Sequence, residues 1–275
     1  MEKRKGCAGS TVVAVLLVIS ILILTVSTVY FFVARTWWFP ESITAVGNDI
    51  DAQFIRTLYI TGLVFVASQL ALAWAILRYR DRGRRATYSH GNNALELIWT
   101  LATAVLIVGL WVYARASWAE VHFRGARDGA VKIQVMAQQF AWNFRYAGAD
   151  GTFGRMIVKK VNNSGIDPFS VDPSDPAAAD DIMTAVIAVP VNEEVELALY
   201  AKDVTHSFFV RELRLKQDLV PGMRIPIHFT ANKVGVYELA CAELCGLGHQ
   251  RMRSFLKVMT RPDFEKWLAD QKAGE

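Results

Sequence analysis

The chain reads Gly235-Val-Tyr-Glu-Leu-Ala-Cys-Ala-Glu-Leu-Cys-Gly-Leu-Gly-His-Gln-Arg-Met-Arg-Ser-Phe-Leu-Lys-Val-Met259, where two alternating apolar runs flank residues with sulfur and imidazole side chains. The alternation over 235–240 and 254–258 predicts two adjacent β-strands, because successive strand residues point to opposite faces of a sheet. The residues between them then form a loop. Two rigid strands would hold the side chains of that loop in fixed positions.

The predicted loop carries soft metal donors at short offsets. Within twelve residues it supplies two thiols, an imidazole and a thioether: Cys241, Cys245, His249 and Met252. A further imidazole, His206, lies upstream at the end of another predicted strand, 202–210. Thiolate, thioether and imidazole suit copper better than they suit a hard cation. The number and kind of donors predict a copper site with more than one ion.

Other interpretations of the two cysteines remain open. Cys241 and Cys245 could form a disulfide in an oxidising compartment, although a disulfide explains neither His249 nor Met252. A structural zinc site has no need of Met252. A membrane-tethered copper chaperone could use Cys-x3-Cys to deliver copper, but such proteins resemble thioredoxins and have one anchor helix. A blue single-copper site needs only one cysteine.

Further alternating runs follow residue 115 and are separated by glycine and proline. They fall at 131–137, 194–200 and 225–230. Many short strands with turn signals between them predict an all-β sandwich or barrel of antiparallel strands over 116–275. Residues 163–181, rich in Pro, Asp, Ser and Ala, are expected to form a long solvated loop. Residues 262–272 begin with proline and space apolar side chains as a helix does, which predicts a short C-terminal helix.

The first 115 residues contain three apolar blocks. They fall at about 11–34, 58–77 and 97–114. Each block has about 20 residues, enough for a helix to cross a bilayer, so 1–115 is predicted to be a transmembrane helical region. The first block could instead be a cleaved secretory signal, since basic residues precede it: Lys3, Arg4 and Lys5. Its apolar run is long for a signal and ends without a small-x-small site, so we expect a retained helix.

The placement of arginine predicts the orientation of these helices. Five arginines lie between the second and third blocks: Arg78, Arg80, Arg82, Arg84 and Arg85. Residues 36–54, between the first and second blocks, contain no lysine or arginine. By the positive-inside rule, the arginine loop and the N-terminus face the cytoplasm. Three crossings then place 116–275 on the outer side, in a bacterial periplasm.

The net charge of +4 does not indicate nucleic-acid binding. Residues 1–115 carry 11 basic and 6 acidic side chains, whereas residues 116–275 carry 19 basic and 20 acidic ones. The positive excess therefore belongs to the membrane part, where it orients the helices. The third cysteine, Cys7, lies in the predicted cytoplasmic tail and is expected to be incidental.

The pattern Cys-x-Glu-x-Cys-Gly-x-x-His-x-x-Met at 241–252, with Asp-Val-x-His-Ser at 203–207, resembles the copper A site of cytochrome c oxidase subunit II. The likeness runs from about residue 58 to the end. It implies a helical hairpin in the membrane and a cupredoxin-like Greek-key domain outside it. It also implies ligands for two copper ions: bridging Cys241 and Cys245, one imidazole each from His206 and His249, and weak axial donors from Met252 and the carbonyl of Glu243.

The resemblance implies roles for two carboxylates. The Glu243 side chain matches one that in the family reaches a magnesium ion shared with subunit I. Glu96 precedes a Leu-Ile-Trp-Thr sequence at 97–100, and the family has a carboxylate before a similar Trp-Thr pair at the entrance of a proton pathway into subunit I. The helix dipole also favours a carboxylate at a helix start, so Glu96 has a structural explanation as well.

An aromatic run, Gln139-Phe-Ala-Trp-Asn-Phe-Arg-Tyr146, matches a family segment in which one tryptophan receives the electron from cytochrome c. When the two segments are aligned on Trp142, Phe140 occupies the position of that family tryptophan. Phe140 and Trp142 are therefore both candidates for the place where the electron enters. Aromatic residues at alternate positions are also typical of a buried strand face. The acidic side chains of 163–181 could attract a basic cytochrome, although a solvated loop explains them equally.

The resemblance implies the redox subunit of a haem–copper terminal oxidase, which passes electrons from cytochrome c to haem in subunit I for oxygen reduction and proton pumping. No catalytic residue is expected in this chain, because it has neither haem ligands nor a membrane-embedded histidine cluster. Its donor is expected to be a separate cytochrome c or a cytochrome c domain of a neighbouring complex, since the sequence has no Cys-x-x-Cys-His motif. A quinol-oxidase subunit, with the same fold but no copper, is the alternative that the full ligand set disfavours. The first helix departs from the family's two-helix pattern.

Overall fold

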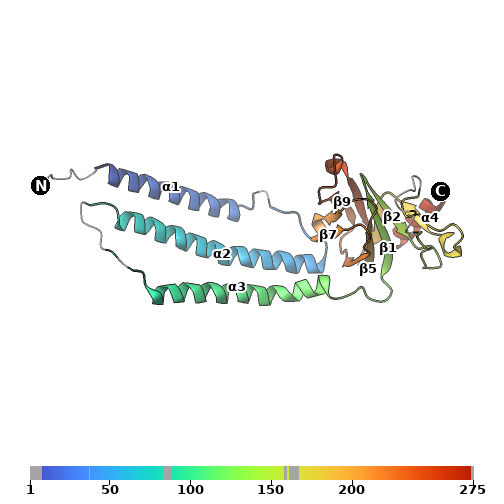
Figure 1. Cartoon of the computed structure of the whole chain (residues 1–275), viewed down its shortest axis with the longest axis horizontal. Helices are drawn as coiled ribbons and strands as arrows, with labels where there is room; N and C mark the ends of the chain where they lie inside the picture. Colours follow the sequence, from blue (N-terminus) through green and yellow to red (C-terminus); the bar gives the residue numbers. More distant parts are fainter. Residues whose placement is uncertain are drawn as a thin grey trace. The chain divides into compact units, whose positions relative to one another are not determined.

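The computed structural model describes residues 8–36, 38–82, 88, 90–157, 160 and 167–273. Several residues named above lie outside this part of the chain: Lys3, Arg4, Lys5, Cys7, Arg84, Arg85 and residues 163–166. The chain divides into two compact units. Figure 1 colours the ribbon by residue number, so each unit can be located in it. Their bounds are Met1–Phe39 with Ala52–Ala114 for the first, and Pro40–Asp51 with Arg115–Glu275 for the second.

Long apolar helices build the first unit. They are α1 (Ala8–Val33), α2 (Ala45–Arg78) and α3 (Asn93–His122) (Figure 1). Each contains a stretch long and apolar enough to cross a membrane, which confirms the prediction of three membrane helices. α2 and α3 extend beyond the apolar blocks that predicted them. Hydropathy marks only the apolar part of a helix, so it missed the turns that contain charged residues.

The beginning of α2 belongs to the second unit. Thr44 caps the helix, because its Oγ1 accepts a hydrogen bond from Gly47 N at 2.9 Å. The preceding Ile43 is buried in the β domain. Its N–H donates to Glu212 O at 2.9 Å and its carbonyl accepts from Asn232 N at 2.8 Å. This short segment is therefore part of the β domain, although it precedes two of the membrane helices in the sequence.

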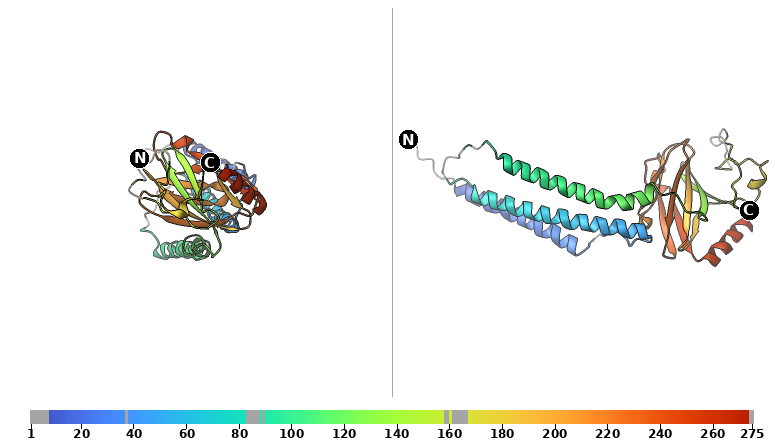
Figure 2. Two further views of the ribbon diagram at one scale, coloured as in Figure 1. Left: turned by 90° about the vertical axis from the view of Figure 1, so that its right-hand side faces the viewer. Right: turned by 90° about the horizontal axis from the view of Figure 1, so that it is seen from below.

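The second unit is a sandwich of two five-stranded sheets (Figures 1 and 2). The first has the order β3-β2-β1-β5-β8, with bounds Ile182–Thr184, Ala141–Tyr146, Val131–Gln138, Glu194–Ala201 and Ile225–Thr230. The second has the order β4-β10-β9-β6-β7, with bounds Ile187–Pro190, Arg253–Met259, Gly235–Cys241, His206–Val210 and Leu215–Leu219. The predicted cupredoxin-like β domain is confirmed.

Most neighbouring strands are antiparallel, as expected, but two pairs are parallel. β1 pairs with β5 in parallel, and β4 pairs with β10 in parallel. Parallel neighbours need a long connection between them. The intervening strands and loops provide it, because β2, β3 and β4 all come between β1 and β5 in the sequence. Alternation of apolar residues predicts that a strand exists but does not predict its direction relative to a neighbour.

Side chains between the two sheets form the core of this unit. Those with no exposed surface include Val135, Leu197, Phe208 and Leu239. The C-terminal helix α4 (Arg261–Ala273) contacts β3 and β4 and buries Phe264 against the same core. Figure 2 shows α4 in red beside the strands. The helix predicted for 262–272 is therefore present and closes one side of the sandwich.

Described residues of the connection from β2 to β3 bury side chains and contact Arg145 of β2. Phe169 in this connection has no exposed surface. Arg145 of β2 is also fully buried and forms an ion pair with Asp181, whose side chain is 2% exposed. An Arg145 Nη also donates to the carbonyl of Gly154 at 2.7 Å. The described residues 167–181 are irregular and mostly partly exposed or exposed, as expected for a loop, but Phe169 and the Asp181 carboxylate are buried. Composition does not reveal that a buried arginine needs a carboxylate partner.

Candidate metal centre

Strand ends and one loop bring the predicted ligands together. β9 ends at Cys241 and β10 begins directly after Met252. The base of the loop is closed, because Cys241 N donates to Met252 O at 3.1 Å. His206 is the first residue of β6, which pairs with β9 in the same sheet. His249 begins a short 3-10 turn inside the loop.

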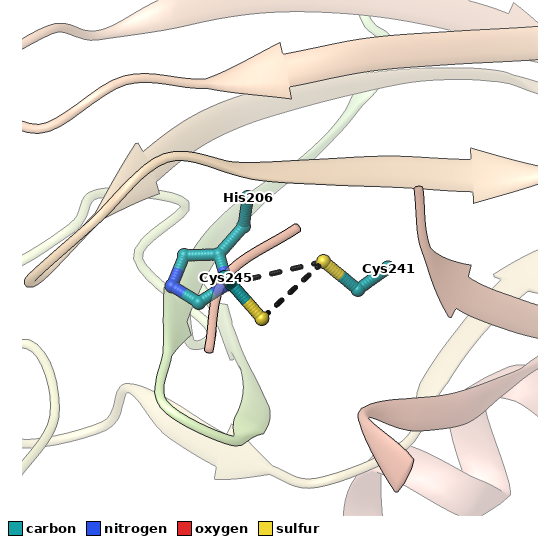
Figure 3. Close-up of side chains that lie close together, drawn as sticks. All are labelled: His206, Cys241 and Cys245. Atoms are coloured by element: carbon teal, nitrogen blue, oxygen red, sulfur yellow. Dashed lines mark hydrogen bonds between the residues drawn. The ribbon is translucent and has the colours of Figure 1, made fainter. Parts of the chain in front are cut away.

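One group of donors surrounds the sulfur of Cys241. Its Sγ lies 3.9 Å from His206 Nδ1 and 3.2 Å from the carbonyl oxygen of Glu243. Figure 3 shows the imidazole of His206 and the thiol of Cys245 both directed at this sulfur. Cys241 therefore has one imidazole nitrogen and one weaker oxygen donor beside it.

A second group surrounds the sulfur of Cys245 in the same way. Its Sγ lies 3.6 Å from His249 Nδ1 and 3.8 Å from Met252 Sδ. The two groups meet at the sulfur atoms, since Cys245 Sγ is 3.9 Å from Cys241 Sγ. Each thiol thus has one imidazole nitrogen and one weak donor of its own, and the two thiols face each other.

The two thiols are free and available to a metal. Their sulfur separation is far longer than the roughly 2.05 Å of a disulfide bond. Cys241, Cys245 and His206 are buried, and their donor atoms lie within 4.8 Å of one another. Such a group can hold a metal ion, and thiolate and imidazole donors are consistent with copper. The residues present therefore fit a copper site.

The two thiols differ in how readily they lose a proton. Burial raises the pKa of Cys241, but the adjacent imidazole of His206 has the opposite effect, and the pKa falls to about 6. Burial and the charge of the Cys241 thiolate raise the pKa of Cys245 to about 11. Because the two groups titrate as a pair, one thiolate is present at neutral pH. A bound cation must displace the proton of the second thiol.

Two residues to which the sequence assigned no role contact the donors from outside. Asp203 Oδ1 lies 2.8 Å from His206 Nε2. Gln139 Nε2 donates to the carbonyl of Cys245 at 2.5 Å. Burial disfavours the carboxylate of Asp203, but hydrogen bonds from Gln139 N and His206 hold its pKa below the usual value. The only sequence signal was the position of Asp203 in the Asp-Val-x-His pattern.

Of the two predicted aromatic residues, Phe140 reaches the surface and Trp142 does not. The Phe140 side chain is 39% exposed and packs on the ligand loop. A Cβ at Gly248 would lie 2.5 Å from Phe140 Cδ2, so only glycine fits there. Gly246, with φ of +134°, faces the same ring. Trp142 is buried in the core with its ring edge-on to Phe208, as expected for a buried strand face.

The side chains of the two predicted carboxylates are not part of the donor group described above. Glu96 is exposed in the first turn of α3, whose N-terminus is capped by Asn92 Oδ1. Glu96 belongs to the helical unit, whereas the metal donors belong to the β domain. The carbonyl of Glu243 faces Cys241, while its side chain is partly exposed.

Membrane helices joined to a β sandwich that buries a group of soft metal donors define a membrane-bound electron-transport protein. Residues 131–259 match the family described as cytochrome c oxidase subunit II, periplasmic domain. The "Alternative cytochrome c oxidase subunit 2" of Bradyrhizobium diazoefficiens is 31% identical over 255 residues, covering 92% of this chain and 90% of that protein. "Cytochrome c oxidase subunit 2" of Synechocystis sp. is 28% identical over 250 residues, covering 84% and 74%.

The crystal structure of the periplasmic domain of subunit II of cytochrome oxidase from Bradyrhizobium japonicum aligns with a TM-score of 0.40 and 24% identity, covering 54% of this chain and 98% of that one. The extent and identity of the sequence matches settle the family. The chain belongs to the cytochrome c oxidase subunit II family and is a subunit of a haem–copper oxidase complex.

Proposed function

We propose that this chain is the electron-accepting subunit of a cytochrome c oxidase and that it holds a dinuclear copper A centre. The pairing of the donors carries the proposal. Two facing thiols each have their own imidazole and their own weak donor. A blue single-copper site would leave the second thiol without a role, and a structural zinc site would leave the thioether without one.

In this proposal the copper ions would be held by the thiolates of Cys241 and Cys245, the imidazoles of His206 and His249, and the weak donors Met252 Sδ and Glu243 O. When bound, the copper pair supplies a one-electron carrier between cytochrome c and the haem of subunit I, where oxygen is reduced to water and protons are pumped. The chain contributes donors held at strand ends and in the closed loop between β9 and β10, and it buries His206, Cys241, Cys245 and Met252. Because such donors move little when copper changes its oxidation state, the reorganisation energy of electron transfer is small.

The proposal extends to the surface where the electron arrives. Phe140 is exposed and packs directly on the ligand loop, which supports a role in contacting the electron donor. Trp142 is buried in the core and would act from within the domain. The donor would be a separate cytochrome c or a cytochrome c domain of a neighbouring complex. This assignment predicts that substitutions at Phe140 reduce cytochrome c oxidation more than they reduce folding stability.

The proposal also assigns the membrane part. Residues 1–115 would cross the bacterial inner membrane beside subunit I, with 116–275 in the periplasm. The uneven distribution of arginine supports this orientation. Glu96, at the cytoplasmic start of α3, would lie at the entrance of a proton pathway. The Glu243 side chain would reach a magnesium ion shared with subunit I.

Substitution of one bridging cysteine tests the proposal. In Cys245→Ser the second group of donors loses its thiol. The electron signal shared over two coppers and the oxidation of cytochrome c should therefore disappear together. Cys7→Ser is the matched control and should leave both unchanged. Electron paramagnetic resonance of the purified oxidase, with turnover measured on the same sample, gives both readouts. Normal turnover in Cys245→Ser would be fatal to the assigned role.

A further inference from the structure

A chain of hydrogen bonds outside the donor set connects its two halves. It begins at the imidazole of His206, where Nε2 lies 2.8 Å from Asp203 Oδ1. The other carboxylate oxygen, Asp203 Oδ2, accepts a hydrogen bond from Gln139 N at 2.7 Å. The Gln139 side chain then donates from Nε2 to the carbonyl of Cys245. One aspartate and one glutamine therefore connect a ligand of the first group to a ligand of the second.

These two residues come from parts of the chain that the ligand loop does not contain. Gln139 lies between β1 and β2, and Asp203 lies between β5 and β6. β1, β2 and β5 belong to the first sheet, whereas β6 and the loop after β9 belong to the second. The hydrogen-bond chain thus fixes the ligands against the β1–β2 turn of the first sheet and the β5–β6 connection between the two sheets. Neither residue supplies a donor atom to the group described above.

The contact at His206 has a defined chemical consequence. Nδ1 of the imidazole faces Cys241 Sγ, so Nε2 is the nitrogen that carries hydrogen when Nδ1 binds a cation. Donation from Nε2 to a carboxylate fixes both the tautomer and the orientation of the ring, and it makes Nδ1 a stronger donor. Asp203 is also held by Val204 N at 2.7 Å, which limits its movement.

The contact at Cys245 acts on the backbone of the loop. Gly246 and Gly248 lack side chains that could anchor this stretch, and Leu247 is 98% exposed. The Gln139 amide is the side chain that fastens the carbonyl of Cys245 in the described part of the chain. It therefore controls where the second sulfur lies relative to the first.

We propose that Asp203 and Gln139 are positioning residues that act as one bridge and set the relative position of the two halves of the metal site. The inference rests on the proposed copper centre. It predicts that loss of either residue loosens the site without removing a ligand. It also predicts that the two residues are not independent, because the Asp203 carboxylate holds the backbone N–H of Gln139 and thereby the side chain that reaches Cys245 O.

Resistance of the bound copper to a chelator measures this effect in the assembled oxidase. The electron signal of the copper pair is followed while a copper chelator is added. Asp203→Ala and Gln139→Ala should each lose copper at a chelator concentration about 10–100-fold lower than the wild type. Asp203→Asn keeps an oxygen acceptor for His206 Nε2, but its amide NH2 cannot accept the hydrogen bond from Gln139 N, so it should lose about as much resistance as Gln139→Ala. It also serves as the test if Asp203→Ala fails to assemble.

Matched controls separate this role from a general loss of stability. Gln138→Ala removes a neighbouring amide that pairs with Lys202 Nζ at 3.2 Å. Asp218→Asn removes a carboxylate that pairs with Lys216 Nζ at 2.9 Å. Both controls should keep wild-type resistance. Asp203→Asn should also alter the nitrogen hyperfine coupling of one bound histidine and leave that of the other unchanged.

The double variant Asp203→Ala/Gln139→Ala tests whether the residues form a single bridge. It should lose little more resistance than Asp203→Ala alone, because that variant already releases both His206 and the backbone of Gln139. Losses that multiply would show two independent contacts and overturn the inference. The inference would also be overturned if the single variants kept the chelator resistance of the controls while the wild type showed its shared-electron signal. A wild type without that signal would refute the proposed copper centre itself and the inference with it.

Discussion

Removing the carboxylate of Asp181 should destabilise the β domain far more than its place in an acidic loop would suggest. The side chains of Arg145 and Asp181 are 0% and 2% exposed, so Asp181→Ala leaves a guanidinium charge buried without its counterion. Breaking a buried pair in this way costs about 3–5 kcal/mol. At about 2–4 °C per kcal/mol for a domain of this size, the melting temperature should fall by about 6–20 °C.

Thermal unfolding of the purified full-length protein, followed by circular dichroism of the β domain, measures this loss. Asp172→Ala is the matched control: it lies in the same loop, but its partner Arg155 is 70% exposed, so a smaller loss is expected. The double variant Arg145→Met/Asp181→Ala removes both charges and should recover most of the stability. A loss in Asp181→Ala no larger than in Asp172→Ala would refute the reasoning. So would a double variant as unstable as the single one.

Two further predictions concern the ligand loop. Gly248→Ala places a Cβ against the ring of Phe140 and should destabilise the protein by about 1–3 kcal/mol, and Phe140→Ala in the same chain should relieve most of that loss in a melting experiment. An equal loss with and without the ring would contradict the packing described here. Binding of copper at pH 8 should release about one proton from the thiols, because Cys241 is already ionised and Cys245 is not. Below pH 6 the number should rise, because Cys241 becomes protonated and the His206 imidazole, whose pKa is raised, despite burial, by its thiol and carboxylate neighbours, also carries a proton that a bound cation must displace. Titration calorimetry in buffers of different ionisation enthalpy counts these protons; a constant number across this range would argue against the assignment.

The donor loop could be predicted from the sequence because its information is local. Cys241, Cys245, His249 and Met252 all lie between two strands whose alternation is clear, and the closed base of the loop brings them together. His206 required one more step, since its place beside β9 depends on strand pairing. The resemblance of the motif to a known family supplied that step. The three membrane helices followed from hydropathy in the same direct way.

The supporting residues could not be predicted because their contacts join distant parts of the chain. Gln139 lies 106 positions before the carbonyl that it holds. Asp181 was interpreted as one of several solvated carboxylates, yet it neutralises an arginine 36 positions earlier in the chain. Composition and periodicity carry no information on such pairs. A charged residue within a strand, such as Arg145 in an aromatic run, was the one signal that a buried partner was needed.

The metal content of the isolated oxidase tests the central claim most directly. The arrangement of Cys241 and Cys245 predicts two copper ions per copy of this chain beyond those of the other subunits. One unpaired electron should be shared equally over both. Elemental analysis combined with electron paramagnetic resonance of the same sample measures both quantities. Zinc in place of copper, or one copper with its electron on a single nucleus, would contradict the account.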